Sequence, residues 1–193
     1  MHMRYRNVAV GLLVVLALAV GAYFYFLPTA PSAPAATALF GDVTATPALN
    51  DAVAAAPRGH PEGWEEYYNN RYGFSLFHPP QQKVQEFDEG GGAMTITFED
   101  ATSVSGFQIF VVPYSGLQIT EDRFIQDVPS GVRTNVENTY VGGARAVTFN
   151  SYNALLGDTR EVWFIRNGYL YEVTTFKGDT DWFTPTMQSW SFL

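Results

Sequence analysis

Acidic side chains are the residues of this sequence most able to do chemistry, and many of them occur in close pairs. Paired carboxylates serve as general acid and base in glycoside hydrolysis, and they also supply oxygen ligands to Ca²⁺. The pairs are Glu65-Glu66, Asp88-Glu89, Glu99-Asp100, Glu121-Asp122 and Asp179-Thr180-Asp181. None of them has the spacing of an EF-hand loop, and adjacent carboxylates are usually solvated loop charges. Asp179 follows Gly178, and we expect it to cap a helix.

Histidine and serine add no further catalytic pattern. The three histidines are His2, His60 and His78, and only His78 falls within the expected folded module. A multi-histidine metal site is therefore not expected there. His78 precedes Pro79-Pro80, and we interpret it as a surface residue or a hydrogen-bonding core residue. The chain lacks a G-x-S-x-G motif, and Gly90-Gly91-Gly92 lacks the ending of a phosphate-binding loop, so we expect a hinge or hairpin there.

These observations predict no catalytic, cofactor-binding or metal-binding residues, no cofactor and no enzyme activity. The absence of cysteine excludes disulfides, thiolate nucleophiles, zinc–thiolate sites and lipid attachment through a cysteine. From Pro61 onward there are 8 Lys and Arg against 17 Asp and Glu, a net charge of −9. Such an acidic module is a poor nucleic-acid binder, because phosphate binding depends on Lys and Arg.

The N-terminal region carries the clearest signal, which is a transmembrane helix over residues 8–27. This stretch is uncharged and dominated by apolar residues over 20 positions, enough for a helix to cross the ~30 Å hydrocarbon core. Arg4 and Arg6 precede it, and no Lys or Arg follows until Arg58. The positive-inside rule then places residues 1–7 in the cytoplasm and the rest of the chain outside the cell membrane as a single-pass protein.

A cleaved signal peptide is the alternative interpretation, with Ala33-Pro34-Ala35 as the cleavage site. The apolar stretch is longer than the usual 7–15-residue core of a signal peptide, which favours an uncleaved signal-anchor. Residues 28–63 are rich in Pro and Ala and are expected to form a flexible tether. Residues 64–193 are expected to form one extracytoplasmic domain.

Alternating and apolar runs predict that this domain is α+β, with an antiparallel β-sheet and helices packed on it. Residues 94–98 alternate as a half-buried strand, and residues 107–112 are apolar on both faces, as in a central strand. Asn167-Gly168 between two strand patterns predicts a type I′ hairpin. The other expected strands are 74–77, 84–87, 132–140, 144–151, 159–166 and 169–176.

Two helices complete the prediction. Thr120 is expected to cap a short helix whose Phe124, Ile125 and Val128 face inward. A second helix is expected from about residue 181 to residue 189, with Phe192 docking the end of the chain.

Three motifs in this domain resemble the PsbP-like superfamily over residues 64–193. The first is Tyr68-Asn69-Asn70-Arg71-Tyr72-Gly73-Phe74-Ser75-Leu76, similar to an opening of the form Y-x-N-x-x-Y-G-F-S-[IL]. The second is the hairpin ending in residues 167–173, and the third is the closing Ser189-Trp190-Ser191-Phe192. The sequence departs from the pattern at Phe77-His78-Pro79-Pro80, where similar openings continue as tyrosine-proline-tryptophan.

The resemblance implies an α-β-α sandwich around an antiparallel sheet and a binding or scaffold role without enzyme activity. A shared fold does not by itself transfer function. Our leading hypothesis is a membrane-anchored, non-catalytic binding or scaffold domain with an envelope protein or glycan as partner and no nucleic acid. The alternatives are an anchored envelope-polymer hydrolase that uses paired carboxylates, and an accessory subunit of a membrane complex.

Overall fold

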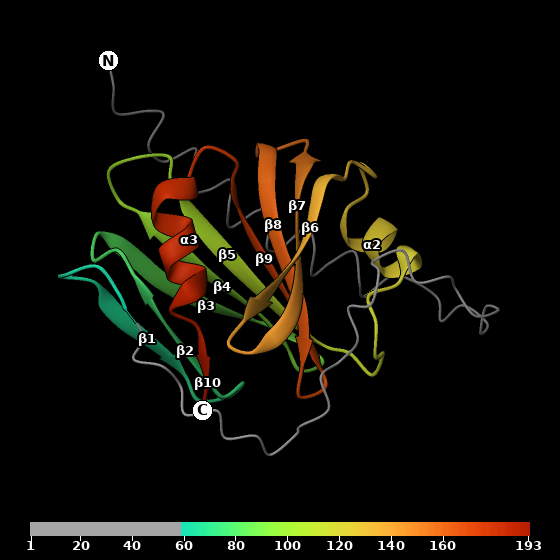
Figure 1. Ribbon diagram of the computed structural model, residues 1–193, viewed down its shortest axis with the longest axis horizontal. Coiled ribbons are helices and arrows are strands. Elements are labelled where there is room, and N and C mark those ends of the chain that lie inside the picture. Colours follow the sequence, from blue (N-terminus) through green and yellow to red (C-terminus); the bar gives the residue numbers. More distant parts are fainter. Residues whose placement is uncertain (1–58) are drawn as a thin grey trace.

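The computed structural model of the chain describes residues 59–193 (Figure 1). The predicted cytoplasmic segment 1–7, the anchor 8–27 and the tether up to residue 58 lie outside the described residues. Among residues 59–193, none of the helices has the length and apolar character needed to span a membrane.

Seven antiparallel strands form the main sheet, in the order β3-β4-β5-β9-β8-β7-β6. They are β3 (Gln82–Gly90), β4 (Ala93–Asp100), β5 (Gly106–Pro113), β6 (Thr134–Val141), β7 (Ala144–Asn153), β8 (Gly157–Arg166) and β9 (Tyr169–Phe176). Each strand pattern predicted between residues 84 and 176 corresponds to one of these strands. Asn167 and Gly168 have φ values of 52° and 79°, which confirms the predicted hairpin between β8 and β9.

A second sheet of three strands was not predicted. It consists of β1 (Glu65–Asn69), β2 (Phe74–His78) and β10 (Ser191–Phe192), in the order β1-β2-β10. The end of the chain reaches this sheet because the N–H of Leu193 donates to the carbonyl of Gly73 at 2.9 Å. The prolines at 79 and 80 end β2, because proline supplies no ladder donor.

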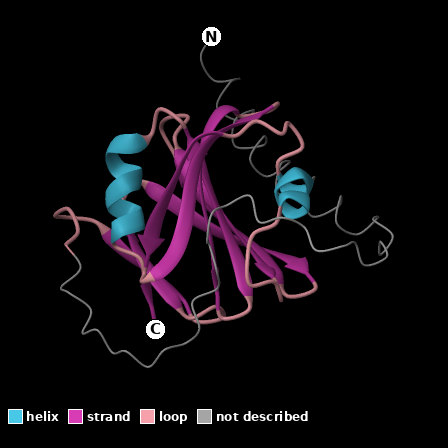
Figure 2. Cartoon of the chain, turned by 45° about the vertical axis from the view of Figure 1, so that its right-hand side comes forward, coloured by secondary structure: helices cyan, strands magenta, loops and turns pink. Residues whose placement is uncertain are grey.

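Two hydrophobic clusters form the core, and they lie on opposite faces of the seven-stranded sheet. Helix α3 (Thr180–Gln188) and the small sheet pack against the first, which includes Phe74, Phe98 and Trp190. Helix α2 (Glu121–Asp127) packs against the second, which includes Phe124 and Trp163. Figure 2 shows the two helices on opposite sides of the strands. The domain therefore consists of antiparallel sheets with few helices, since α2 and α3 have only 7 and 9 residues.

Two burial predictions were wrong. Thr95 and Thr97 are buried, so β4 is covered on both faces rather than half-buried. Ile125 is 48% exposed, whereas Phe124 and Val128 are buried as predicted. Helix α2 is a single short element, and only one stripe of a helix can face a sheet.

Candidate functional site

The predicted acidic pairs do not converge in the fold. Glu65-Glu66 lies in β1, Asp88-Glu89 in β3, Glu99-Asp100 at the end of β4, and Glu121-Asp122 in the first turn of α2. Within residues 59–193, no group of three or more histidine, aspartate or glutamate side chains is arranged to hold a metal ion. The pairs of the described residues therefore lie on separate elements of the fold.

Asp179 occupies the N-cap position of helix α3, as predicted, but its side chain makes no capping hydrogen bond. Its Oδ2 instead accepts hydrogen bonds from the hydroxyl of Ser105 at 2.9 Å and from the N–H of Gly106 at 3.2 Å. The carboxylate thus connects the start of β5 to the start of α3. Asp179 and its two donors are more than 70 residues apart in the sequence, so a local capping pattern does not predict this contact.

His78 is a core residue, which decides between the two interpretations of its sequence position. Its Nδ1 lies 3.0 Å from the carbonyl oxygen of Pro79, to which the ring donates, and its ring contacts Phe98 edge-on at 5.1 Å. Burial lowers the pKa of His78, and the hydrogen bond to Pro79 opposes this. The imidazole of His78 is therefore buried and hydrogen-bonded within the domain.

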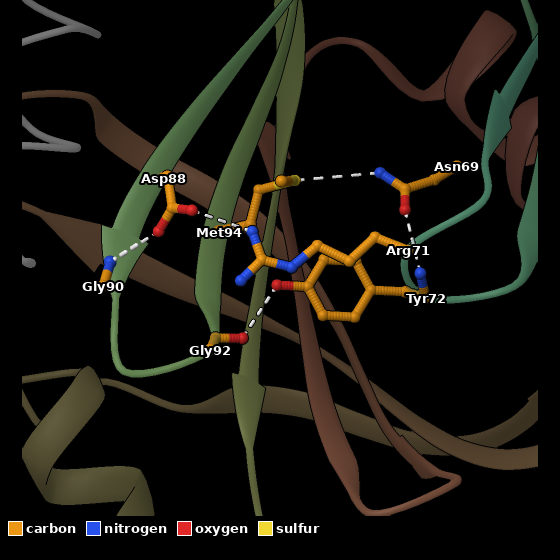
Figure 3. Close-up of polar contacts among 7 residues, drawn as sticks. All are labelled: Asn69, Arg71, Tyr72, Asp88, Gly90, Gly92 and Met94. Atoms are coloured by element: carbon orange, nitrogen blue, oxygen red, sulfur yellow. Dashed lines mark hydrogen bonds and ion pairs between the residues drawn. The ribbon is translucent and has the colours of Figure 1, made fainter.

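The motif that opens the domain holds the β3–β4 hairpin in place (Figure 3). The Asn69 side chain accepts a hydrogen bond from the Tyr72 N–H at 3.0 Å and points its Nδ2 at the sulfur of Met94, 3.7 Å away. The Tyr72 hydroxyl donates to the carbonyl oxygen of Gly92 at 2.8 Å. The tyrosine and asparagine of the motif thus connect the small sheet to the hairpin of the large one.

Arg71 completes this connection from the outside (Figure 3). Its guanidinium pairs with Asp88 at 2.9 Å, and Asp88 also accepts from the N–H of Gly90 at 2.8 Å. The backbone of Gly90 lies at φ 79°, a conformation that glycine adopts without strain. The polar contacts that Figure 3 draws for Asn69, Arg71 and Tyr72 are all within the domain, so these three residues of the motif have a structural role.

Replacing Tyr72 with phenylalanine tests that role. Loss of the hydroxyl leaves the Gly92 carbonyl without its donor, and we expect the free energy of unfolding to fall by about 1 kcal/mol. Urea denaturation measures the change. The matched control is Tyr140→Phe, which alters a 69% exposed ring and should leave stability nearly unchanged. Equal effects of the two substitutions on stability would contradict a structural role for the Tyr72 hydroxyl.

A cluster of three buried titratable groups lies beneath helix α2. Arg123 forms an ion pair with Asp127 one helical turn later, and its Nη2 lies 3.1 Å from Oε1 of Glu172 on β9. The side chains of Arg123, Asp127 and Glu172 are only 11%, 2% and 9% exposed. This acid cluster of Arg123, Asp127 and Glu172 connects α2 to the centre of the sheet.

Both carboxyl groups of the acid cluster favour protonation. Burial raises the pKa of Glu172 well above its usual value, the neighbouring Asp127 charge raises it further, and Arg123 opposes the rise. Burial also raises the pKa of Asp127, opposed by its hydrogen bond to Glu172 and by Arg123. One guanidinium cannot neutralise two buried carboxylates. For this reason the pKa of Glu172 stays well above its usual value although Arg123 lies close by.

A third buried carboxyl, Glu161 on β8, belongs to the same face of the sheet. The hydroxyls of Thr159 and Thr174 each donate to it at 2.7 Å, and the indole N–H of Trp163 donates at 3.4 Å. Burial raises the pKa of Glu161, and these three donors oppose the rise. No sequence motif identified Glu161 or Glu172, although a glutamate between apolar strand residues, as in Tyr171-Glu172-Val173, is a usable signal.

Raised carboxyl pKa values are typical of active sites, but they also occur in structural networks. Here Asp127 and Glu172 each pair with Arg123, and Glu161 accepts from threonine hydroxyls and an indole. A glycosidase needs its two carboxyls on either side of a substrate and open to it. The ion pair between Arg123 and Glu172 therefore attaches α2 to the sheet.

Comparison with known proteins then addresses the fold. No protein-family model matches the chain, and no curated protein matches it. Among solved structures, the solution structure of cyanobacterial PsbP (CyanoP) from Synechocystis sp. PCC 6803 is similar, with a TM-score of 0.51 and 13% sequence identity. The match covers 72% of this chain and 100% of CyanoP. The described part of the chain has a PsbP-like fold. At this identity the likeness concerns the fold alone, and it confirms the resemblance inferred from the three motifs of the PsbP-like domain.

Proposed function

We propose that this protein is anchored in the cell membrane by one N-terminal helix and presents its PsbP-like domain outside the membrane as a non-catalytic binding or scaffold module of the envelope. The observation that carries the proposal is the division of the chain. The similarity covers the whole length of CyanoP and leaves over a quarter of this chain unmatched. Residues 8–27, with Arg4 and Arg6 before them, precede the described domain.

The finer architecture follows the same proposal. We infer a transmembrane helix over residues 8–27, a tether over residues 28–63, and an α-β-α arrangement in which α2 and α3 cover opposite faces of the sheet. The length of the tether lets the domain reach partners away from the membrane surface.

A binding role is supported by how the domain uses its side chains. Its buried acids bond to other groups of the fold, whereas several large apolar side chains are exposed. Exposed apolar side chains on a folded domain are typical of contact surfaces when they lie close together. They are Tyr68, Val104, Leu117, Ile125, Val132, Val136, Tyr140, Tyr152, Leu155 and Leu193.

An anchored hydrolase is the second candidate, and the proximity of Asp127 and Glu172 is the observation that favours it. If Glu172 were the acid of such an enzyme, Glu172→Gln would abolish hydrolysis of envelope polymers and leave the fold intact. Release of soluble fragments from purified cell-wall material by the unaltered protein, lost in Glu172→Gln, would replace the non-catalytic proposal.

Topology is tested with single cysteines, because the natural chain has none. We expect Ala154→Cys, at an exposed turn of the domain, to react with a membrane-impermeant maleimide in intact cells. Asn7→Cys should react only after the membrane is permeabilised, and both variants should stay in the membrane after alkaline carbonate extraction. Labelling of Ala154→Cys only in lysed cells, or its release by carbonate, would refute the anchored topology.

The binding role is tested separately by crosslinking in the same intact cells. A binding module should be recovered with an envelope protein or glycan attached. Repeated recovery of this protein without any other envelope component would contradict the role, even if the topology were as proposed.

A further inference from the structure

Strand β6 is an edge of the seven-stranded sheet, and within residues 59–193 no strand pairs with its outer side. All of its residues are exposed except Thr139, which is partly buried, and Val141, which is buried. Proteins usually protect such edges with charges, proline or bulges, because unpaired N–H and C=O groups can pair with another strand. The opposite edge, β3, has four charged residues in nine, whereas β6 has only Glu137.

The hairpin between β6 and β7 determines which backbone groups of β6 are free. Gly142 and Gly143 have φ values of 54° and 79°, and Val141 pairs with Ala144, as in a two-residue type I′ hairpin. In such a hairpin the residues next to the turn are hydrogen-bonded, and the bonding then alternates along the strand. The N–H and C=O groups of Asn138 and Tyr140 therefore point to the open side.

We propose that β6 pairs antiparallel with β6 of a second copy of this chain, so that two domains form one continuous sheet. The regular part of the edge is short, because the register shifts between Thr134 and Glu137. Within this part, one register hydrogen-bonds all the free groups of both strands. It places Asn138 beside Tyr140 of the second copy, Tyr140 beside the second copy's Asn138, and the two Thr139 residues opposite each other.

Charge also supports this register. The domain is strongly acidic, so two copies repel each other unless their contact surfaces are locally neutral. In the proposed pairing, Glu137 faces Val141 of the second copy, and no two carboxylates are opposed. Glu137 also lies 3.8 Å from Arg160 of its own chain. A pair of threonines at the centre is among the favourable cross-strand combinations.

A single cysteine at the centre of the pairing tests the proposal. The two Thr139 residues form a non-hydrogen-bonded pair, whose Cα separation of about 4.5 Å lies within the range that a disulfide spans. We expect Thr139→Cys in the purified full-length protein in mild detergent to form disulfide-linked dimers on oxidation. The matched control is Gln85→Cys, an exposed position on the other edge strand β3, which should form far fewer.

A second substitution distinguishes crosslinking through paired β6 strands from crosslinking through random collisions. Asn138→Pro removes an outward N–H without touching the hydrogen bonds to β7, and its loss deletes two symmetry-related bonds of the dimer. Combined with Thr139→Cys it should reduce crosslinking by about tenfold or more. Tyr140→Lys, which leaves the backbone donor in place and introduces opposing charges at the edge, should act in the same direction if the proline variant is unfolded.

Three results would overturn the proposal. The first is equal crosslinking of Thr139→Cys and Gln85→Cys. The second is unchanged crosslinking when either edge substitution is present in folded protein. The third is sedimentation of the unaltered protein as a monomer at every concentration. Crosslinking of Thr139→Cys in cells to a different protein, with no homodimer, would assign the edge to a foreign strand instead.

Discussion

Arg123→Met is expected to lower the free energy of unfolding by about 3–5 kcal/mol at neutral pH, because it leaves two buried carboxyl groups without their cation. Asp127 and Glu172 both lose an ion-pair partner, and neither has water to replace it, since their side chains are 2% and 9% exposed. Methionine keeps much of the apolar stem of arginine, so lost packing contributes little. Urea denaturation followed by tryptophan fluorescence measures the change.

The pH dependence of this loss gives a sharper test. Because their folded-state pKa values are raised from 4.5 and 3.8, Glu172 and Asp127 add stability that is fully present below those ordinary values. That stability is lost as the pH rises through the raised pKa values. Without Arg123 both pKa values rise further, so the deficit of Arg123→Met should grow from pH 4 to pH 8. A deficit that is constant over this range would contradict the electrostatic account.

Two control variants separate the buried charge from arginine itself. Arg71→Met removes an arginine whose pair with Asp88 is exposed to water, and it should leave stability nearly unchanged. The triple variant Arg123→Met, Asp127→Asn, Glu172→Gln removes the guanidinium and both ionisable carboxyl groups of the acid cluster. We expect it to regain most of the stability that Arg123→Met loses, because a neutral buried cluster needs no counter-charge.

The sequence predicted the features of this fold that depend on neighbouring residues. Asn167-Gly168 specifies its hairpin because both residues tolerate positive φ, and this holds wherever the two strands lie in the sheet. The cap of α2 is also local, because the Thr120 hydroxyl accepts its hydrogen bond from the N–H of Arg123, three residues later and 3.2 Å away. The strand pattern also predicted each of the seven segments between residues 84 and 176 that form the main sheet, although it did not predict their order in that sheet.

Contacts between distant segments were out of reach. The small sheet forms because Phe192 pairs with Phe74, and because the Ser189 hydroxyl accepts from the Phe77 N–H at 2.8 Å across 112 residues. The polar residues Thr95 and Thr97 have the alternation of an exposed face, yet that face of β4 is buried. Alternation reports which residues share a face, and only tertiary packing decides what covers it.

The candidate site was missed for a related reason. The predicted sites consisted of carboxylates adjacent in the sequence, and the fold separates these pairs. The acid cluster instead joins Arg123 to Glu172, which are 49 residues apart. Glu161 and Glu172 were hidden within strands whose apolar character dominated the prediction. A charged residue inside an apolar strand needs a buried partner, so the better sequence question is which cation on a neighbouring helix can reach it.

Gly106→Ala is the other substitution expected to have a large effect, and it concerns a residue that no motif marked. An added Cβ would overlap the carbonyl oxygen of Phe98 on β4 and lie 3.3 Å from the Cα of Glu99. The backbone of Gly106 also has φ 155°, a value that residues other than glycine rarely adopt. Both obstacles involve backbone rather than a flexible side chain, so we expect a loss of about 3–5 kcal/mol.

The position of Gly106 explains why the damage should spread. Its N–H donates to Asp179 at 3.2 Å, and its carbonyl accepts from the Thr175 hydroxyl at 2.8 Å. A shift of β5 at this point therefore loosens the end of β9 and the start of α3 together. Gly178→Ala is the matched control, because an added Cβ there meets no atom within 4 Å, and its stability should stay close to that of the unaltered protein. If both alanine variants unfold at the same urea concentration as the unaltered protein, the close packing of β4 against Gly106 does not limit the stability of this domain.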